Sequence, residues 1–374
     1  MKICFDAFSL SHLPNTGLYS YSYELINSLL TIYPQPKYSL ITNNGGSEIP
    51  FNKGKGLAID LLDIDRKKND YSLIGNYLSN NKIRLYHSLN NGFSIPDEKE
   101  CKYVVTIHDM LPMSDKTLVD DKYFNKHINL VPKALEKADK VIAVSNFVME
   151  ELVKYYDVPQ DKIEVVYPIV SKGFKDIWEV HSKNFMRKHY DITDDYVLYA
   201  GGLHERKQLP LLLSTFKEVI KREANLKLLI VGSTKGKREH HYINLLNDAK
   251  KLGIAEKVHF LGPIPYKHMP YIYNAANCFL NLSTYEGYPL AAVEAKECGT
   301  SIVCLENSSF KEVLDNYPTY IKTIEPKVIA DKVLESIYRS SEIFMANSSK
   351  HSTVEEKKPV NQMINIYESL MYIW

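Results

Sequence analysis

Two carboxylates, Glu286 and Glu294, have the spacing in this chain that points most directly to chemistry. Glu286 lies in the loop before a short expected helix, and Glu294 is expected about two turns into that helix. Pro289 suits the first turn of this helix, and Gly299 suits the residue after its last turn. The unpaired backbone N–H groups at such a helix start form an anion site. Carboxylates beside an anion are useful when they bind hydroxyls. The pattern therefore indicates a phosphate between a sugar and a ribose, as in a nucleotide sugar.

A second candidate site follows an expected strand at residues 196–200, where Gly201 and Gly202 precede Arg206 and Lys207. The glycines allow a tight turn and close approach of the backbone, and the two cations suit a diphosphate. The alternative is a solvated pair of cations at a helix start. Because cations there oppose the helix dipole, we favour the functional interpretation.

Two further turns in the same half of the chain, 232–234 and 260–265, also follow expected strands. They could line a nucleotide pocket through the Ser233 hydroxyl and through backbone groups such as those of Ile264. Taken alone, each is an ordinary turn at the end of a strand, and we favour that interpretation over a role in binding.

The first half of the chain offers Gly17 and His108. Gly17 lies between the first expected strand and the first helix, which is where a phosphate loop would lie, although the GxGxxG spacing is absent. His108 ends a strand, and a histidine there could bind a hydroxyl or shuttle a proton. A capping pair of His108 with Asp109 accounts for the same residues equally well.

The elements that must position these residues are β-rich runs alternating with amphipathic stretches. The expected strands are residues 2–7, 38–42, 84–87, 103–108, 140–145, 163–167, 196–200, 227–231, 258–261, 278–282 and 301–305. This alternation predicts parallel, doubly wound α/β sheets, and so many strands suit two Rossmann-like domains better than one. Ligands of such sheets bind outside the carboxyl ends of the strands, which is where the candidate residues fall.

The domain boundary is expected in residues 168–195, where charge is mixed and the pattern breaks. We predict an N-terminal domain over 1–170 and a C-terminal domain over 171–358. A last helix in residues 359–374 is expected to pack back on the N-terminal domain. The apolar residues of 367–374 could instead touch a membrane surface, and packing is the favoured interpretation.

Composition narrows the class of protein. With 374 residues, 45% hydrophobic and 24% charged, and a net charge of +1, the chain is typical of a soluble globular protein and gives no electrostatic reason to expect nucleic acid as a partner. No run approaches 18 apolar residues, and the start lacks the features of a signal peptide. The odd number of cysteines, 5, suggests reduced thiols and a cytoplasmic location. No metal or serine-hydrolase motif is present, so no metal site is expected.

At this point the residues resemble a known family, the retaining glycosyltransferases of family 4 (group 1), which have the GT-B fold. The resemblance rests on the Glu-x7-Glu segment at 285–295 with Cys-Gly-Thr after it, on the 201–207 loop, and on segments 108–112, 138–145, 258–262 and 273–277. It covers most of the chain. It implies two Rossmann-like domains facing each other across a cleft, with the acceptor held by the N-terminal domain and the nucleotide sugar by the C-terminal one.

The resemblance also implies a role for each matched residue. Arg206 and Lys207 would bind the diphosphate, Glu286 the hydroxyls of the transferred sugar, and Glu294 the ribose. Gly17 would approach the diphosphate and His108 the sugar. Further donor contacts are implied for Gly201, Gly202, Ser233, Ile264, Gly287, Tyr288, Pro289 and Leu290. The chain departs from the family at Gly202, where an Arg is common, and at Pro289 and Ala291, which replace a Gly and a Pro.

The expected function is therefore that of a metal-independent, retaining hexosyltransferase with no cofactor beyond its co-substrate, a nucleotide-diphosphate sugar. The donor would be a GDP- or UDP-hexose, with a lean to mannose. The acceptor would be a hydroxyl of a glycan or lipid-linked molecule in bacterial surface polysaccharide or lipopolysaccharide assembly, which would place the enzyme in the cytoplasm, with peripheral contact to the inner face of the plasma membrane as an open alternative. The other functions left open are a non-catalytic nucleotide-sugar-binding protein, an epimerase and an inverting transferase on the same fold.

Overall fold

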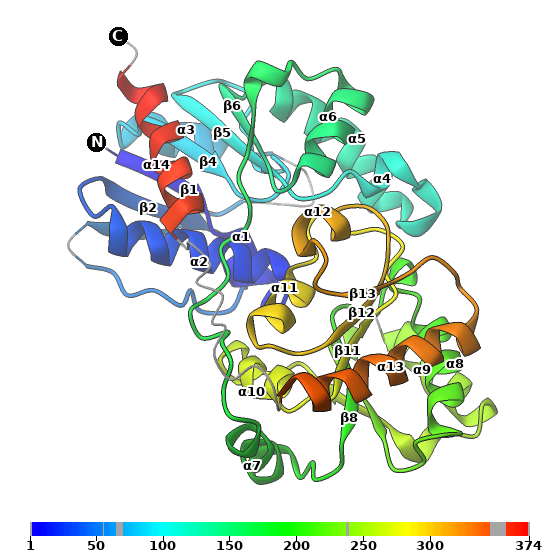
Figure 1. Cartoon of the computed structure of the whole chain (residues 1–374). Helices are drawn as coiled ribbons and strands as arrows, with labels where there is room; N and C mark the ends of the chain where they lie inside the picture. Colours follow the sequence, from blue (N-terminus) through cyan, green and yellow to red (C-terminus); the bar gives the residue numbers. More distant parts are fainter. Residues whose placement is uncertain (1, 55, 65–69, 237–238, 345–356, 373–374) are drawn as a thin grey trace. The chain divides into compact units, whose positions relative to one another are not determined.

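The computed structural model describes residues 2–54, 56–64, 70–236, 239–344 and 357–372. The chain forms two compact units (Figure 1). The first unit comprises Met1–Ile169 and Glu355–Trp374, and the second comprises Val170–Val354. Assigning the acceptor to the first unit and the donor to the second stays a prediction.

The first unit is built on a parallel sheet of seven strands in the order β3-β2-β1-β4-β5-β6-β7. The strands are β1 Lys2–Asp6, β2 Lys37–Thr42, β3 Leu57–Leu61, β4 Leu85–Ser88, β5 Lys102–Ile107, β6 Lys140–Ala143 and β7 Ile163–Val165. The helices are α1 Phe8–His12, α2 Gly17–Ile32, α3 Ser72–Asn80, α4 Leu111–Ser114, α5 Asp121–Lys137, α6 Asn146–Tyr156 and α14 Lys357–Tyr372. After central strand β1 the chain adds β2 and β3 on one side, and β4 then pairs with β1 on its other side. The topological switch point, where the strand order reverses, therefore lies between β1 and β4.

The second unit repeats this plan with a parallel sheet of six strands in the order β10-β9-β8-β11-β12-β13. The strands are β8 Tyr196–Ala200, β9 Lys227–Val231, β10 Val258–Gly262, β11 Cys278–Asn281, β12 Ile302–Leu305 and β13 Thr319–Ile321. The helices are α7 Glu179–Tyr190, α8 Leu209–Ile220, α9 Glu239–Lys251, α10 Met269–Asn274, α11 Leu290–Glu297, α12 Phe310–Leu314 and α13 Pro326–Phe344. Here the switch point lies between β8 and β11.

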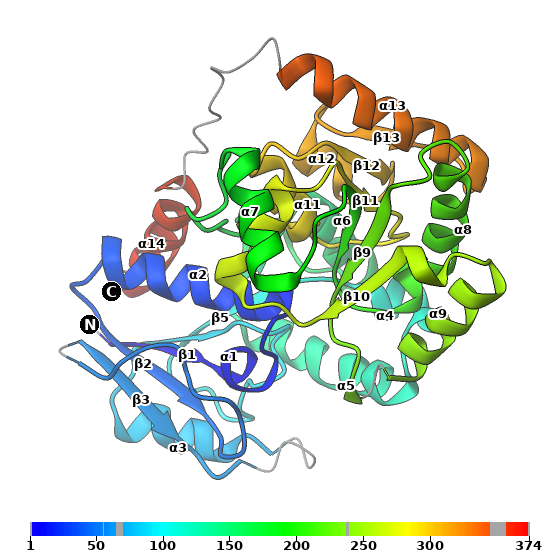
Figure 2. The ribbon, with the colours of Figure 1, turned by 90° about the horizontal axis from the view of Figure 1, so that it is seen from below.

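Both faces of the second sheet are covered, which explains why its strands are continuous apolar runs. Along β8, Val197 and Tyr199 pack into one core with residues of α8, α9 and α13. The alternate residues Tyr196 and Leu198 point to the other core, formed with α7, α10, α11 and α12. Figure 2 shows α8 and α9 beside this sheet, and α13 packs against α8.

The C-terminal helix α14 belongs to the first unit and contacts α2 (Figure 1). The Tyr33 hydroxyl donates to Glu368 Oε1 at 2.7 Å, and Arg84 Nη2 donates to the Met371 carbonyl at 3.1 Å. Both bonds hold the C-terminal turns of the helix against the first unit. Residues 373–374 of the predicted helix lie outside the described residues.

The predicted fold class of two doubly wound α/β domains is confirmed, and three elements were not anticipated. Strand β3 forms one edge of the first sheet, and β13 forms one edge of the second. Helix α7 lies within the segment expected to be an irregular junction, where Met186 and Ser182 are buried against the second unit. None of the helices in the described ranges combines the length and the apolar character needed to cross a bilayer.

Candidate active site

The site is built at the switch point of the second sheet. The loop after β8 carries Arg206 and Lys207, and the loop after β11 carries Glu286. Strands β8 and β11 are hydrogen-bonded neighbours, with Val197 opposite Cys278. Because the strands are parallel, both loops leave the same edge of the sheet, and residues some 80 positions apart in sequence meet there.

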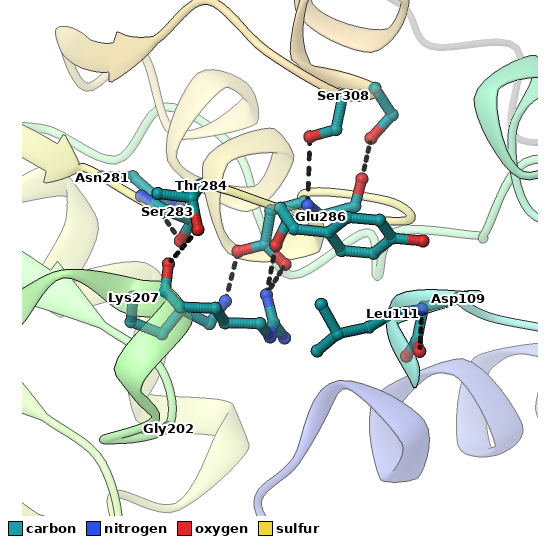
Figure 3. Close-up of polar contacts among 12 residues, drawn as sticks. Asp109, Leu111, Gly202, Lys207, Asn281, Ser283, Thr284, Glu286 and Ser308 are labelled. Atoms are coloured by element: carbon teal, nitrogen blue, oxygen red, sulfur yellow. Dashed lines mark hydrogen bonds and ion pairs between the residues drawn. The ribbon is translucent and has the colours of Figure 1, made fainter. Parts of the chain in front are cut away.

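At this edge a buried carboxylate bridges the two cations. Arg206 Nη1 donates to Glu286 Oε2 at 2.8 Å, and Lys207 Nζ donates to Oε1 of the same carboxylate. Figure 3 shows Lys207 and Glu286 pointing toward one another from the two loops. The side chains of Glu286, Lys207 and Arg206 are 8%, 11% and 20% exposed, so solvent screens the cluster only weakly.

The electrostatics of this cluster follow from its composition. Burial alone would raise the pKa of Glu286, but the guanidinium of Arg206 and the ammonium of Lys207 outweigh it and lower that pKa to about 2. The carboxylate is therefore ionised at neutral pH. Two positive charges against one negative charge leave the cluster with an excess positive charge, which favours a further anion.

Hydrogen bonds to neighbouring loops fix the backbone around Glu286. Its N–H donates to the Ser308 hydroxyl at 3.0 Å, and its carbonyl accepts from Ser309 Oγ at 2.8 Å (Figure 3). The Thr284 N–H donates to the Arg206 carbonyl at 2.8 Å, which ties the two site loops together. Ser308, Ser309 and Thr284 were not predicted as site residues. The polar run after the expected strand 301–305 is the signal that could have found the two serines.

The glycine-rich turn after β8 is set by close packing of two backbones. Gly201 has φ +154°, and a Cβ built at Gly232 would lie 2.0 Å from the Gly201 carbonyl oxygen. The loops after β8 and β9 can therefore cross only because Gly232 has no side chain. Gly202 and Ser233 adjoin this crossing and are partly exposed, and their contact with a donor stays a prediction. Ile264 differs, since its side chain is buried in the core and only its backbone could reach a ligand.

Helix α11 begins at Leu290, immediately after Pro289, and ends before Gly299, which has φ +75°. Glu294 lies little more than one turn into the helix, closer to its start than the two turns expected. Its carboxylate is 6% exposed, and its Oε2 accepts a hydrogen bond from the Tyr273 hydroxyl at 3.0 Å. Of the residues predicted to supply donor contacts in this loop, Gly287 and Pro289 are buried, while Tyr288 and Leu290 are partly exposed.

In the first unit, His108 follows β5 and its ring is held in one tautomer. Its Nε2 lies 2.7 Å from the Leu89 carbonyl oxygen, which can only accept, so Nε2 carries the proton. Its backbone N–H donates to Asn91 Oδ1 at 2.7 Å. Burial lowers the pKa of His108, which keeps the ring neutral at pH 7. Nδ1 is then an acceptor, suited to a hydroxyl.

Gly17 opens helix α2 after the Thr16 cap, whose hydroxyl accepts from the Tyr19 N–H at 3.3 Å. Gly17 is exposed, and a Cβ added there would meet no heavy atom within 4 Å. The fold therefore does not require a glycine at position 17. A ligand that comes close to the backbone there would require one, because a side chain would block its approach. The described residues contain no group of three or more His, Cys, Asp or Glu that could hold a metal ion.

Comparison with known structures places this geometry in a class. The structure of WaaG, a glycosyltransferase involved in lipopolysaccharide biosynthesis, matches 96% of this chain and 98% of its own at a TM-score of 0.74 and 15% identity. HepE from Anabaena, in complex with UDP-glucose, matches 99% of this chain and 100% of its own at a TM-score of 0.73 and 15% identity. The chain has the fold of the GT-B glycosyltransferases.

The sequence comparisons supply the family. Residues 182–350 match the model for glycosyl transferases group 1, and residues 70–172 match the model for glycosyltransferase family 4. The O-antigen chain mannosyltransferase B of Escherichia coli is 24% identical in an alignment of 366 positions, which covers 91% of this chain and 92% of the relative. This protein belongs to the group 1, family 4 glycosyltransferases, and that membership supports transferase activity.

Proposed function

We propose that this protein is a retaining glycosyltransferase that moves a hexose from a nucleotide-diphosphate sugar to a hydroxyl of a glycan or lipid-linked acceptor. The observation that carries the proposal is the buried cluster of Arg206, Lys207 and Glu286 at the switch point of the second sheet. A diphosphate needs fixed cations, and a sugar next to it needs a fixed hydroxyl acceptor. The cluster supplies both within one set of contacts.

The proposal gives each predicted site residue a task. Arg206 and Lys207 bind the diphosphate and neutralise it as it leaves, while Glu286 accepts from hydroxyls of the transferred sugar. Glu294 binds the ribose, and His108 Nδ1 accepts from a sugar hydroxyl. The Ser233 hydroxyl and backbone groups contribute the remaining contacts, the backbone groups being those of Gly17, Gly201, Gly202, Ile264, Gly287, Tyr288, Pro289 and Leu290.

The chemical step uses the charge that these residues provide. The bond between the anomeric carbon and the diphosphate oxygen breaks, and its electron pair stays on the diphosphate. The acceptor oxygen forms the new bond on the same face of the sugar, and its proton passes to the departing phosphate oxygen. Arg206 and Lys207 stabilise the developing negative charge, the task that a metal ion performs in other sites, so we propose that no metal is needed.

Mannose is the sugar we propose first, carried by a GDP or UDP donor. The relative that matches nearly the whole chain is an O-antigen mannosyltransferase, which also supports an acceptor in bacterial surface polysaccharide or lipopolysaccharide assembly. UDP-glucose bound to HepE supports a nucleotide sugar as donor. The proposed location is cytoplasmic. Peripheral contact at the inner face of the plasma membrane, where a lipid-linked acceptor would be reached, is the open alternative.

The test is a thermal-shift panel of GDP-, UDP- and dTDP-hexoses, followed by turnover of each donor that stabilises the protein. We expect one donor class to raise the melting temperature and to release its nucleoside diphosphate, and we expect the product sugar to keep its anomeric configuration by NMR. A donor that binds without any hydrolysis or transfer would favour a non-catalytic nucleotide-sugar-binding protein. Inverted product would favour an inverting transferase, and a rearranged sugar would favour an epimerase.

A further inference from the structure

A buried chain of polar side chains crosses the core of the first unit, and the proposed reaction gives it no role. It starts at the Tyr367 hydroxyl on α14, which lies 2.6 Å from His87 Nδ1. His87 Nε2 lies 2.8 Å from Thr106 Oγ1, which in turn lies 3.0 Å from the Tyr21 hydroxyl. His87, Thr106 and Tyr367 have no exposed surface and Tyr21 has 4%, so water cannot replace any of these bonds.

The chain ends against His108. The Tyr21 ring meets the His108 ring edge to face, with centroids 4.7 Å apart and planes at 88°. Thr106 supports His108 by a second route, because its carbonyl accepts from the Asn91 N–H at 3.0 Å and the Asn91 side chain accepts from the His108 N–H. Both the ring contact and the backbone contact of His108 therefore depend on where Thr106 lies.

Packing alone does not call for such a chain, because apolar residues of the same volume fill a core equally well. What a fully satisfied buried network adds is one specific arrangement. Neutral His87 has one donor and one acceptor, so the bond it makes with Tyr367 decides which role remains for Thr106. The role of Thr106 in its bond to His87 is thereby coupled to helix α14, and when Thr106 donates to His87 it can only accept from Tyr21.

We propose that Tyr367 on the C-terminal helix is a positioning residue for His108, acting through His87, Thr106 and Tyr21. The inference rests on the proposed function in one respect, namely that His108 contacts the transferred sugar. The link itself is a property of the ligand-free fold and can be measured without any turnover.

The test compares Tyr367→Phe with the matched control Tyr33→Phe in the full chain. Each substitution removes one tyrosine hydroxyl bonded between α14 and the rest of the first unit, but the Tyr33–Glu368 bond lies outside the chain. We expect Tyr367→Phe to lower kcat about tenfold while the donor KM changes less than about twofold, because a small displacement of a positioned group mainly affects the chemical step. Tyr33→Phe should change neither value.

NMR of selectively labelled histidines in the ligand-free protein supplies the second readout. In Tyr367→Phe we expect the His108 ring signals to shift, since the ring current of Tyr21 acts on them, and in Tyr33→Phe we expect them to stay. Unchanged His108 signals in a folded Tyr367→Phe protein would overturn the inference. If Tyr367→Phe does not fold, Thr106→Val interrupts the same chain at its middle and must give the same two effects. If no donor is turned over at all, the proposed function fails, and the NMR comparison still decides the link.

Discussion

Replacing Glu286 with Gln tests the charge cluster that the proposed function depends on. Glutamine has the shape of a protonated glutamic acid, so the substitution removes the charge and keeps the volume. The lowered pKa of Glu286, about 2 against an ordinary 4.5, gives the size of the effect. A difference of this kind corresponds to about 3 kcal/mol of folding free energy at pH 7. Because the Glu286 side chain is only 8% exposed, solvent screening does not reduce this value much.

The sign of the pH dependence follows from the direction of the shift. The folded state holds Glu286 ionised to lower pH than the unfolded chain does. Its contribution is therefore complete above the unfolded pKa and disappears as the pH falls toward 2. At pH 3 the wild-type advantage over Glu286→Gln should shrink to about 1 kcal/mol by the same relation.

Thermal unfolding followed by circular dichroism measures the difference in stability between wild type and Glu286→Gln at pH 7 and at pH 3. For a unit of this size, about 3 kcal/mol lowers the melting temperature by roughly 6 to 12 °C at pH 7. Glu218→Gln is the matched control, since Glu218 pairs with Lys221 at 2.6 Å on an exposed helix surface, where such pairs contribute less than about 1 kcal/mol. A Glu286→Gln protein as stable as Glu218→Gln at pH 7 would refute the reasoning.

Five further substitutions test the other parts of the site and fold. Lys207→Ala should lower kcat by about a hundredfold or more, as loss of one charge-stabilising donor does, and wild-type transfer rates would contradict its role. Glu294→Ala should weaken nucleoside diphosphate binding about tenfold by calorimetry, and unchanged affinity would exclude the ribose contact. Gly232→Ala should destabilise the protein by at least about 2 kcal/mol, because the new Cβ would clash with backbone at 2.0 Å. Gly17→Ala should leave the melting temperature unchanged while weakening donor binding, and equal donor affinity would remove Gly17 from the site. Burial lowers the pKa of His87 to about 3, so the neutral ring makes its full contribution to folding stability above about pH 6.5. Up to about 5 kcal/mol of that folding free energy is lost as the pH falls toward 3. His87→Gln removes this titrating group, so its stability should fall less steeply with acid than that of the wild type.

The central strands were predictable because they are buried on both faces and read as continuous apolar runs. Strands β8 and β9 have the bounds expected from sequence. Strand β3, with the sequence Leu-Ala-Ile-Asp-Leu, lies at a sheet edge, and only its first residue is buried. Strand β13 is three residues long and also half exposed. An edge position alone does not explain why they were missed, because the edge strands β7 and β10 are also partly exposed and were predicted. The apolar run at β13 is Tyr320 and Ile321 alone, whereas β7 continues into Val166 and Tyr167.

Helix α7 was missed for a related reason. Most of its residues are charged or polar, and only Ser182 and Met186 are buried. One turn separates these two positions, which is too little for a helical period to be recognised. Its stability comes from packing against α10, a contact that no local pattern records.

At the site, the residue types were predictable but their pairing was not. Each candidate was recognised from its immediate neighbours, the cations from a glycine turn and Glu286 from a helix start. That the cations bind this carboxylate follows only from the strand order, which places β8 beside β11. The polar chain behind His108 depends in the same way on α14 returning to the first unit. Its members are ordinary core residues until tertiary structure brings them together.

The pairing of Glu286 with both cations has a consequence for how a donor would bind. In the ligand-free protein this carboxylate occupies the groups proposed to bind the diphosphate. An incoming diphosphate must therefore share the two cations with the Glu286 carboxylate or displace it, which weakens diphosphate binding. The hydroxyls of the donor sugar compensate, because they bind the same carboxylate. Glu286→Gln should consequently bind a free nucleoside diphosphate about tenfold more tightly than wild type while transferring sugar more slowly. Weaker binding of the free diphosphate by this variant would show that Glu286 holds the cations in place for the phosphate rather than competing with it.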